Sequence, residues 1–443
     1  MTVLIKILQF IVSLSLLVII HELGHFLFAK YFKTRVEKFY LFFDPWFSLF
    51  KFKKGETEYG IGWLPLGGYV KISGMIDESM DKEQLKLPPQ PYEFRSKTSW
   101  QRLLIMTGGV LFNFILALLI FVFLLYRWGE TYLPTSNVKY GIVTDSVGRS
   151  IGLQNGDKIL SLDNQPVENF MALTSDMVLN MRKTIQIDRN GEHIDIEIPK
   201  EYIPHILKGR GQISYRTPFN AMKIQSLVKE SPAQEAGLLK NDEITGIDGL
   251  TFDYYDEFQN YLAENAGKLV VLDFIRDGKI ETLAVAPDDR GLLGIYFDVN
   301  LSQIFELKTM TYGFFESIPA GIAKGFKTIS DYLKQFRLLF SKETKAYESV
   351  GGFITIANIF PSVWDWQIFW ERTAFLSIIL AVMNILPIPA LDGGHVMFLM
   401  YEVVTGRKPS DKFLEHAQIV GMIILFSLLI LANGNDILGL IRK

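Results

Sequence analysis

Residues 21–25 read His21-Glu22-Leu23-Gly24-His25 and lie inside an apolar stretch that runs from about residue 7 to residue 29. On a helix, His21 and His25 are about one turn apart, so both imidazoles lie on one face. That spacing allows both rings to bind one Zn²⁺ and leaves Glu22 to act as a base on a metal-bound water. Ionisable groups are costly in a lipid-spanning helix, so their presence predicts a functional site rather than a chance match to a short pattern.

The composition is that of a membrane protein with soluble parts. Of 443 residues, 49% are hydrophobic, yet 21% are charged, which is too many for a chain buried wholly in lipid. A net charge of −3 argues against nucleic acid as a partner. The chain has no cysteine, so a metal site must be built from His, Asp or Glu.

Four stretches are long and apolar enough to cross a lipid bilayer, namely 1–30, 103–126, 369–404 and 413–432. The first is predicted to be a retained helix, because no small-x-small cleavage site precedes the histidines. Gly108 and Gly109, with Asn113 close by, predict a close approach of another helix to the second stretch. Pro387 and Pro389 interrupt the third.

Basic residues predict the orientation. They follow the first stretch, precede the second and lie between the third and the fourth. The positive-inside rule makes the loop 31–102 and the short loop near residue 408 cytoplasmic. The long segment between the second and third stretches then lies on the other side of the membrane, and the His21–His25 motif lies toward the cytoplasmic half.

The segment from about 135 to 300 contains a repeat. Residues 146–159 and 231–244 each carry a small-residue turn, a Gly-Leu pair, an acidic turn and an apolar strand. This pattern resembles tandem PDZ domains of the α+β class, with boundaries predicted at 135–215 and 216–300. The resemblance implies binding of an extended peptide as an added strand. A rigid spacer without a ligand is the alternative.

The connector 301–368 contains apolar residues at a spacing of three to four from residue 314 onward. This periodicity predicts an amphipathic helix. The helix either lies on the membrane surface or packs under the soluble domains.

The loop 31–102 contains a stretch, residues 57–72, that is too apolar for a solvent loop and reads as two strands around a Pro/Gly turn. We predict a β-hairpin that dips into the membrane, where non-helical backbone is tolerated if it is buried in protein or lines a wet cavity. Its free edge could pair with an unwound substrate. The residues assigned to substrate binding are Ile61, Gly62, Gly67, Gly68, Tyr69 and Val70.

A third metal ligand is predicted in the interrupted span. Asp392 is a carboxylate that follows Pro387 and Pro389 within an apolar helix. Together with His21 and His25 it makes a His₂-carboxylate set with one position left open, which is typical of catalytic zinc. The alternative is that Asp392 only caps the helix that restarts after it. His395 is expected to pack or to make a polar contact rather than to bind metal.

Three motifs together resemble the site-2 protease family of intramembrane zinc metalloproteases, in its bacterial RseP-like branch. They are His21 to His25, the Pro-Leu-Gly-Gly-Tyr-Val run at 65–70, and the N-x-x-P-x-P-x-L-D-G-G run at 384–394. The resemblance covers essentially the whole chain. It implies a polytopic α-helical membrane protein with four transmembrane helices, a membrane-associated β-hairpin and two PDZ-like domains.

The resemblance also implies the chemistry. His21, His25 and Asp392 would bind zinc, Glu22 would be the base, and Asn384 would hold substrate. Substrates would be single-pass membrane proteins, such as anti-sigma factors already trimmed by an upstream site-1-type protease, and also remnant signal peptides. The PDZ pair would act as a size filter on the extracytoplasmic side of a bacterial inner membrane. One departure is the sequence Leu-Phe-Phe-Asp-Pro at 41–45, where such proteins usually carry G-x-G.

Two other classes of function are weighed against peptide hydrolysis. A catalytically silent membrane scaffold would be marked by loss of Glu22, which is present. A metal-ion transporter would carry carboxylates or histidines along a path through the membrane, whereas the sequence predicts a single cluster. Hydrolysis of a transmembrane helix also requires local unwinding, because such a helix satisfies its own backbone hydrogen bonds.

Overall fold

The computed structural model describes residues 2–75, 88–220, 222–339, 341 and 351–441. It divides into two compact units. The first comprises Met1–Gly129, Thr311–Arg337 and Tyr347–Lys443, and the second comprises Glu130–Met310 and Leu338–Ala346. Parts of two predicted segments, 76–87 of the loop 31–102 and 342–350 of the connector 301–368, lie outside the described residues.

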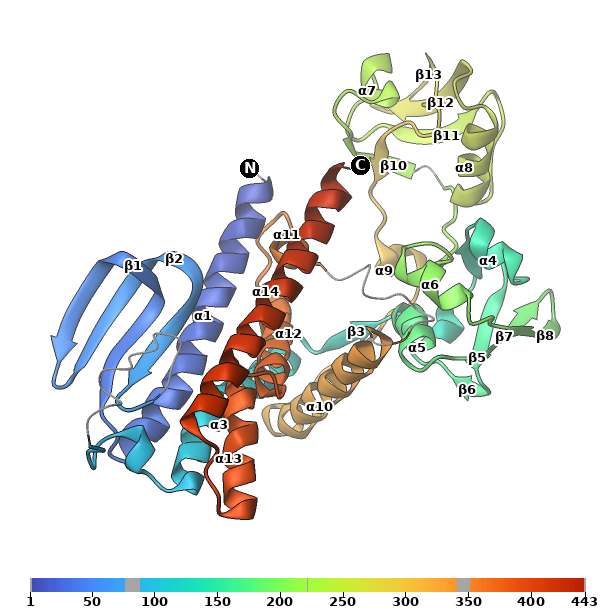
Figure 1. The fold of residues 1–443 in the computed structure, drawn as a ribbon. Coiled ribbons are helices and arrows are strands. Elements are labelled where there is room, and N and C mark those ends of the chain that lie inside the picture. Colours follow the sequence, from blue (N-terminus) through green and yellow to red (C-terminus); the bar gives the residue numbers. More distant parts are fainter. Residues whose placement is uncertain (1, 76–87, 221, 340, 342–350, 442–443) are drawn as a thin grey trace. The chain divides into compact units, whose positions relative to one another are not determined.

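Long apolar helices dominate the first unit (Figure 1). They are α1 (Thr2–Tyr31), α3 (Ser99–Trp128), α12 (Trp366–Ile385) and α14 (Asp411–Ile441). Each contains a stretch long and apolar enough to cross a membrane, so the prediction of four helices of this kind is confirmed for the described residues. A shorter helix, α13 (Asp392–Thr405), follows α12.

The break predicted at Pro387 and Pro389 in the third stretch, 369–404, is present, because α12 ends at Ile385 and α13 begins at Asp392. Two prolines lie in the gap, and a proline removes a backbone donor and disfavours helical backbone in the residue before it. Leu386, which precedes Pro387, is accordingly extended, with ψ 143°. Ala390 has φ 82°, the left-handed region that non-glycine residues rarely adopt.

Glycine allows α1 and α3 to come into backbone contact. A Cβ added at Gly24 would lie 2.2 Å from the carbonyl oxygen of Gly108, and one added at Gly108 would lie 2.6 Å from the carbonyl oxygen of Gly24. A larger residue at either position would therefore force the two helices apart. The close approach predicted from Gly108 and Gly109 is confirmed.

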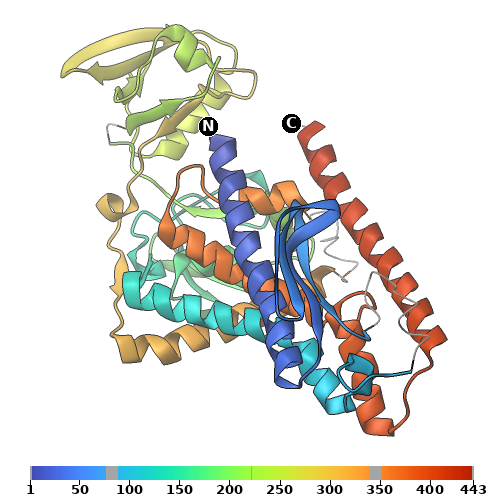
Figure 2. The ribbon, with the colours of Figure 1, turned by 90° about the vertical axis from the view of Figure 1, so that its left-hand side faces the viewer.

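A curved sheet lies beside α1 in both views of the molecule (Figures 1 and 2). It consists of β1 (Val36–Lys54) and β2 (Thr57–Ile72), each of which folds back on itself. Residues 36–41 pair with 68–72 on one side and with 57–61 on the other, and 57–62 pair in turn with 48–54. The sheet therefore has two edges, formed by residues 48–54 and residues 68–72.

The predicted hairpin over 57–72 is wrong, because its two halves do not pair with each other. Residues 36–41 lie between them and pair with both. Alternating apolar residues identify a strand but not its partner, and the partner here lies outside the segment from which the hairpin was predicted.

Helix α10 (Phe314–Leu339) covers the amphipathic stretch predicted in the connector. It packs against α3, because a Cβ at Gly321 would lie 2.6 Å from Val122 and one at Gly325 would lie 2.3 Å from Leu118. A short helix, α11 (Phe353–Asn358), follows, and its first amides donate to the buried carboxylate of Asp436 in α14.

The second unit contains two similar α+β parts. Its strands are β3 (Glu130–Tyr132), β4 (Ile142–Thr144), β5 (Lys158–Leu162), β6 (Gln165–Pro166), β7 (Thr184–Arg189), β8 (Glu192–Glu197), β9 (Ile213–Tyr215), β10 (Met222–Leu227), β11 (Glu243–Ile247), β12 (Val270–Arg276), β13 (Lys279–Val285), β14 (Ile295–Phe297) and β15 (Lys308–Met310). Its helices are α4 (Ser146–Ser150), α5 (Leu173–Leu179), α6 (Tyr202–Leu207), α7 (Pro232–Ala236), α8 (Tyr255–Glu264) and α9 (Leu301–Ile304). The sheets run β6-β5-β7-β8 and β13-β12-β11-β10-β14, with β4-β9 and β3-β15 as separate pairs.

One ion pair repeats in both parts and supports the internal repeat. Arg189 at the end of β7 binds Asp157 at 2.8 Å, and Arg276 at the end of β12 binds Asp242 at 2.6 Å. Each aspartate also accepts a backbone N–H three residues before it, from Gln154 and Leu239 respectively. The two parts therefore share this Arg–Asp ion pair and its backbone hydrogen bond as well as a strand pattern.

Candidate metal centre and its surroundings

Three side chains from two ends of the sequence converge in the first unit. Nε2 of His21 and Nε2 of His25 lie 3.3 Å apart, and Oδ2 of Asp392 lies 3.1 Å from the first and 3.2 Å from the second. The histidines are 8% and 7% exposed. The three residues form a possible metal-binding group within the part of the chain that the structure describes.

These distances fit a zinc ion. Four ligands at about 2.0 Å from a tetrahedral ion lie roughly 3.3 Å from one another, given the usual Zn–N and Zn–O distances. Oδ2 of Asp392 is buried and accepts no hydrogen bond from the described part of the chain. A buried carboxylate oxygen facing two ring nitrogens is stabilised by a cation bound among them. The set supplies three ligands, which leaves a fourth position for water or substrate.

The ring of His25 is fixed by the backbone of α3. Its Nδ1 lies 2.9 Å from the carbonyl oxygen of Ile105. A carbonyl can only accept, so Nδ1 carries the proton and Nε2 presents its lone pair to the site. Hydrogen bonds of this kind orient metal-binding histidines in zinc proteins generally.

Two further residues of α3 contact the ligand rings. A Cβ added at Gly109 would lie 2.4 Å from Nε2 of His25 and 2.6 Å from Cε1 of His21. The side-chain amide of Asn113 lies 3.3 Å from Nδ1 of His21 and is fully buried. From the sequence, both residues are predicted only as sites of helix contact. The sequence could have predicted a polar contact for Asn113, since an amide inside an apolar helix needs a polar partner.

Asn384 is on the last turn of α12, next to the metal group. Its Nδ2 lies 3.3 Å from Nε2 of His21. The amide is thus close enough to touch a molecule held in the open ligand position. Asp392, in turn, is the first residue of α13, where the positive end of the helix dipole stabilises a carboxylate.

One edge of the sheet adjoins the HExxH helix. A Cβ at Gly68 would lie 2.7 Å from Val18 and 3.6 Å from Cγ of Glu22. Gly67, Gly68, Tyr69 and Val70 therefore belong to the edge nearest the predicted base. Tyr69 is held there by a hydrogen bond of 2.9 Å to Asp44, and Asp44 also accepts from Ser48.

The predicted substrate-pairing role of Ile61 and Gly62 is wrong. Ile61 pairs with Leu41 on one side and with Phe50 on the other, so it has no free edge. Gly62 pairs with Ser48, and a Cβ there would lie 2.1 Å from the carbonyl oxygen of Phe43. Both residues belong to the interior of the sheet.

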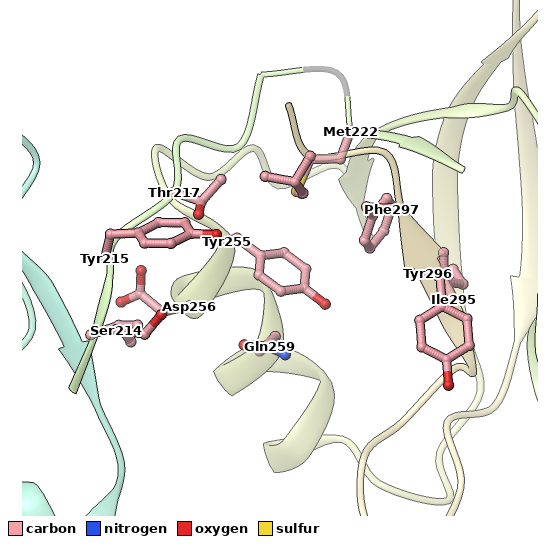
Figure 3. Close-up of a pocket in the computed structure, with 12 residues that line it drawn as sticks. Ser214, Tyr215, Thr217, Met222, Tyr255, Asp256, Gln259, Ile295, Tyr296 and Phe297 are labelled. Atoms are coloured by element: carbon pink, nitrogen blue, oxygen red, sulfur yellow. The ribbon is translucent and has the colours of Figure 1, made fainter. Parts of the chain in front are cut away.

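The second unit contains a cavity of about 370 Å³ (Figure 3). Ile295 and Phe297 of β14 lie across it from Tyr255 and Gln259 of α8. Strand β14 is the last strand of its sheet. The cavity therefore runs between an edge strand and a helix, an arrangement that accepts an extended peptide as an added strand.

Comparison with known proteins agrees with the geometry of the metal group. The model of a family described as peptidase family M50 matches residues 9–428. A protein of Borreliella burgdorferi that bears the name of a zinc metalloprotease is 29% identical over 98% of this chain and 98% of its own length. The regulator of sigma-E protease, RseP, of Salmonella typhimurium is 27% identical over 96% of this chain and 97% of its own. A solved PDZ domain of an SdrC-like protein from Listeria innocua is 27% identical to the 18% of this chain that it covers, with 97% of its own chain covered and a TM-score of 0.17.

Proposed function

Because this chain belongs to peptidase family M50, the site-2 protease family of zinc metalloproteases, we propose that it hydrolyses peptide bonds within transmembrane segments of single-pass membrane proteins. The observation that carries the proposal is the convergence of Nε2 of His21, Nε2 of His25 and Oδ2 of Asp392 at 3.1–3.3 Å on apolar helices. We assign these three residues as the zinc ligands.

Each residue of the assigned site has a separate role in hydrolysis. Zinc, when bound, supplies Lewis acidity toward the attacking water and the scissile carbonyl. Glu22 takes the proton of the water and delivers it to the leaving amine. Asn384, beside His21, hydrogen-bonds to the substrate near the bond that is cleaved. Gly109 leaves room for the ligand rings to approach each other.

We assign the substrate to the edge formed by residues 68–72. A transmembrane helix satisfies its own backbone hydrogen bonds, so it must unwind before water can reach a peptide carbonyl. Among the described strands, residues 68–72 pair with residues 36–41 alone, so the outer side of this edge, next to Glu22, can receive such an unwound segment. Pairing would hold the scissile bond near the metal group and offset part of the unwinding free energy.

The sheet is also suited to contact lipid. Its exposed apolar side chains gather around the far edge and the turn before it, at Trp46, Phe47, Leu49, Phe50 and Phe52. Trp46 is 91% exposed, and its ring stacks on Trp63 with 6.2 Å between centroids. Exposed aromatic clusters of this kind mark a membrane or protein contact. We place this part of the sheet in the bilayer.

We place the chain in a bacterial inner membrane, with the second unit on the extracytoplasmic side and the metal group in the cytoplasmic half. The support is the distribution of basic residues around the apolar helices and the similarity to Salmonella RseP, whose name describes a regulator of sigma-E. The substrates by analogy are anti-sigma factors first cut by a site-1-type protease, and remnant signal peptides.

The test is cleavage in a cell that expresses wild type or Glu22→Gln together with candidate single-pass proteins. Cleavage within the span by wild type, and its loss in Glu22→Gln with zinc content unchanged, is the expected result. Purified wild type should hold about one zinc per chain, and His21→Ala/His25→Ala should hold none. Zinc retained by the double variant would refute the ligand assignment, and cleavage by Glu22→Gln would refute the assigned base.

We further propose that the PDZ-like pair restricts access to the protease. No residue of the assigned catalytic group belongs to the second unit, while the cavity between β14 and α8 suits a peptide. Replacing residues 135–300 with a linker should allow cleavage of substrates that keep bulky outer domains. Continued rejection of those substrates by an otherwise active variant would refute the filter. A passive scaffold, the rival function, predicts no cleavage by any variant.

A further inference from the structure

The amide of Asn113 occupies a position that the chemistry assigned so far does not use. Its side chain is 0% exposed and projects from the middle of α3 toward α1. Nδ2 lies 3.3 Å from Nδ1 of His21, while Oδ1 is buried and receives no hydrogen bond from any residue that the structure describes. The main-chain carbonyl of Asn113 accepts from the hydroxyl of Ser377 in α12, at 2.7 Å. The residue thus joins three helices directly behind one ligand ring.

The proton on His21 decides which end of the amide must face it. Nε2 of His21 points at the ligand atoms of His25 and Asp392, so metal binding requires a lone pair at Nε2. A neutral imidazole then carries its proton on Nδ1, the nitrogen next to Asn113. An N–H at that place needs an acceptor, and an amide nitrogen cannot accept.

A half-turn of the amide about its Cβ–Cγ bond supplies the acceptor. The oxygen then faces Nδ1–H of His21, and the NH₂ group takes the place where Oδ1 has no partner. In either orientation one end of the amide lacks a partner, so the contact with His21 determines which orientation is stable. Both histidines would then donate Nδ1–H to an acceptor on α3, because His25 already donates to the carbonyl of Ile105.

We propose that Asn113 is a positioning residue of the metal site, whose side-chain oxygen accepts Nδ1–H of His21 and so holds Nε2 ready to bind zinc. The proposal rests on the assignment of His21 as a zinc ligand. The hydrogen bond from Ser377 anchors the backbone of Asn113 and keeps the amide at the level of the ring. Partners of this kind change metal affinity by about 10–100-fold in other zinc proteins.

The competing account is that Asn113 only joins helices. Buried amides stabilise helix packing in membranes by hydrogen bonding, without any effect on a metal. The two accounts differ in what the side chain must provide. Helix joining is disturbed by any change of shape or charge, whereas positioning depends on one acceptor oxygen.

The experiment measures zinc affinity of the purified full-length protein by competition with a chelator, together with its thermal unfolding. Asn113→Leu, similar in size and without an acceptor, is expected to bind zinc about 10–100-fold more weakly. Asn113→Asp keeps an oxygen for Nδ1–H and is expected to recover most of that affinity. If Asn113→Leu does not fold, Asn113→Ala takes its place in the same comparison with Asn113→Asp.

Thr373→Val is the matched control. Thr373 is also fully buried and donates to Ser13 of α1 at 3.0 Å, but it does not touch a ligand. Its loss should lower the unfolding temperature and leave zinc affinity unchanged. Equal zinc affinity in Asn113→Leu and wild type, or equal weakness in Asn113→Leu and Asn113→Asp, overturns the proposal. Zinc retained by His21→Ala/His25→Ala instead overturns the site assignment itself.

Discussion

A methyl group at Gly109 would lie 2.4 Å from Nε2 of His25, closer than any real carbon approaches. It would also lie 2.7 Å from Nδ1 of His21. Both imidazole rings therefore pack directly against the backbone of α3 at Gly109. A glycine in this place is a requirement of the metal group and not only of helix packing.

Gly109→Ala should lower zinc affinity by at least about tenfold, in the range seen when groups supporting zinc ligands are altered. The added methyl displaces one or both rings and breaks the spacing among the three ligand atoms. Zinc bound per chain measures the effect. Gly439→Ala in α14 is the control, because among the described residues its Cβ position has no neighbour within 4 Å beyond the adjoining turns of its own helix. A zinc-replete Gly109→Ala variant would show that the rings tolerate displacement.

Val70→Pro should reduce cleavage sharply while zinc content stays at the wild-type level. Proline removes a backbone donor and bends the strand next to Glu22, where we place the substrate. Phe52→Pro makes the same change on the opposite edge and should leave cleavage largely intact. Equal loss in both variants would indicate damage to the sheet as a whole. Ile61 is unsuitable for this test, because its strand pairs on both sides.

Asn384→Ala should slow cleavage by about tenfold or more and leave zinc bound. A lost hydrogen bond to a neutral or developing charged group is worth about 1–3 kcal/mol, and 1.4 kcal/mol is a factor of ten in rate. Initial rates and zinc content should be measured on one preparation. Ile385→Ala, at the neighbouring and partly exposed position, is the control. Loss of zinc from Asn384→Ala would instead make Asn384 part of the metal group.

Asp242→Asn should destabilise the second PDZ-like part at neutral pH by about 2 kcal/mol, the range for a hydrogen bond to a charged group. Burial alone would raise the pKa of Asp242, but Arg276 and the N–H of Leu239 outweigh it and lower the pKa. A carboxyl with a lowered pKa in the folded state contributes stability above its unfolded pKa, near 3.9, and loses it as the pH falls through the folded value.

The difference between Asp242→Asn and wild type should therefore be full at pH 7 and shrink below about pH 4. Amide hydrogen exchange in residues 222–297 of the full-length protein measures it. Asp289→Asn, at an exposed position, should show no such difference at any pH. A difference that persists unchanged at acid pH would mean that shape, not charge, accounts for the effect.

The convergence of His21, His25 and Asp392 could be predicted from sequence because each part of the pattern is local. His21 and His25 are about one helical turn apart, and Asp392 follows two prolines, which predict a helix break from the sequence alone. The order of strands in the sheet could not be predicted, since residues 36–41 separate two runs that look like a hairpin. The contacts of Gly109, Ile105 and Asn113 with the two histidine rings depend on how α3 crosses α1. The rotation of a helix about its axis cannot be predicted from its apolar composition.

The division of the metal group between α1 and α13 has a consequence for biosynthesis. A ribosome delivers His21 and His25 before the whole of Glu130–Met310 and Asp392 after it. Membrane insertion of α12 and docking of α13 must therefore precede any hydrolysis. Until Asp392 has been synthesised, the nascent chain lacks one of the three residues assigned as zinc ligands, and by then every residue of the PDZ-like pair has been synthesised.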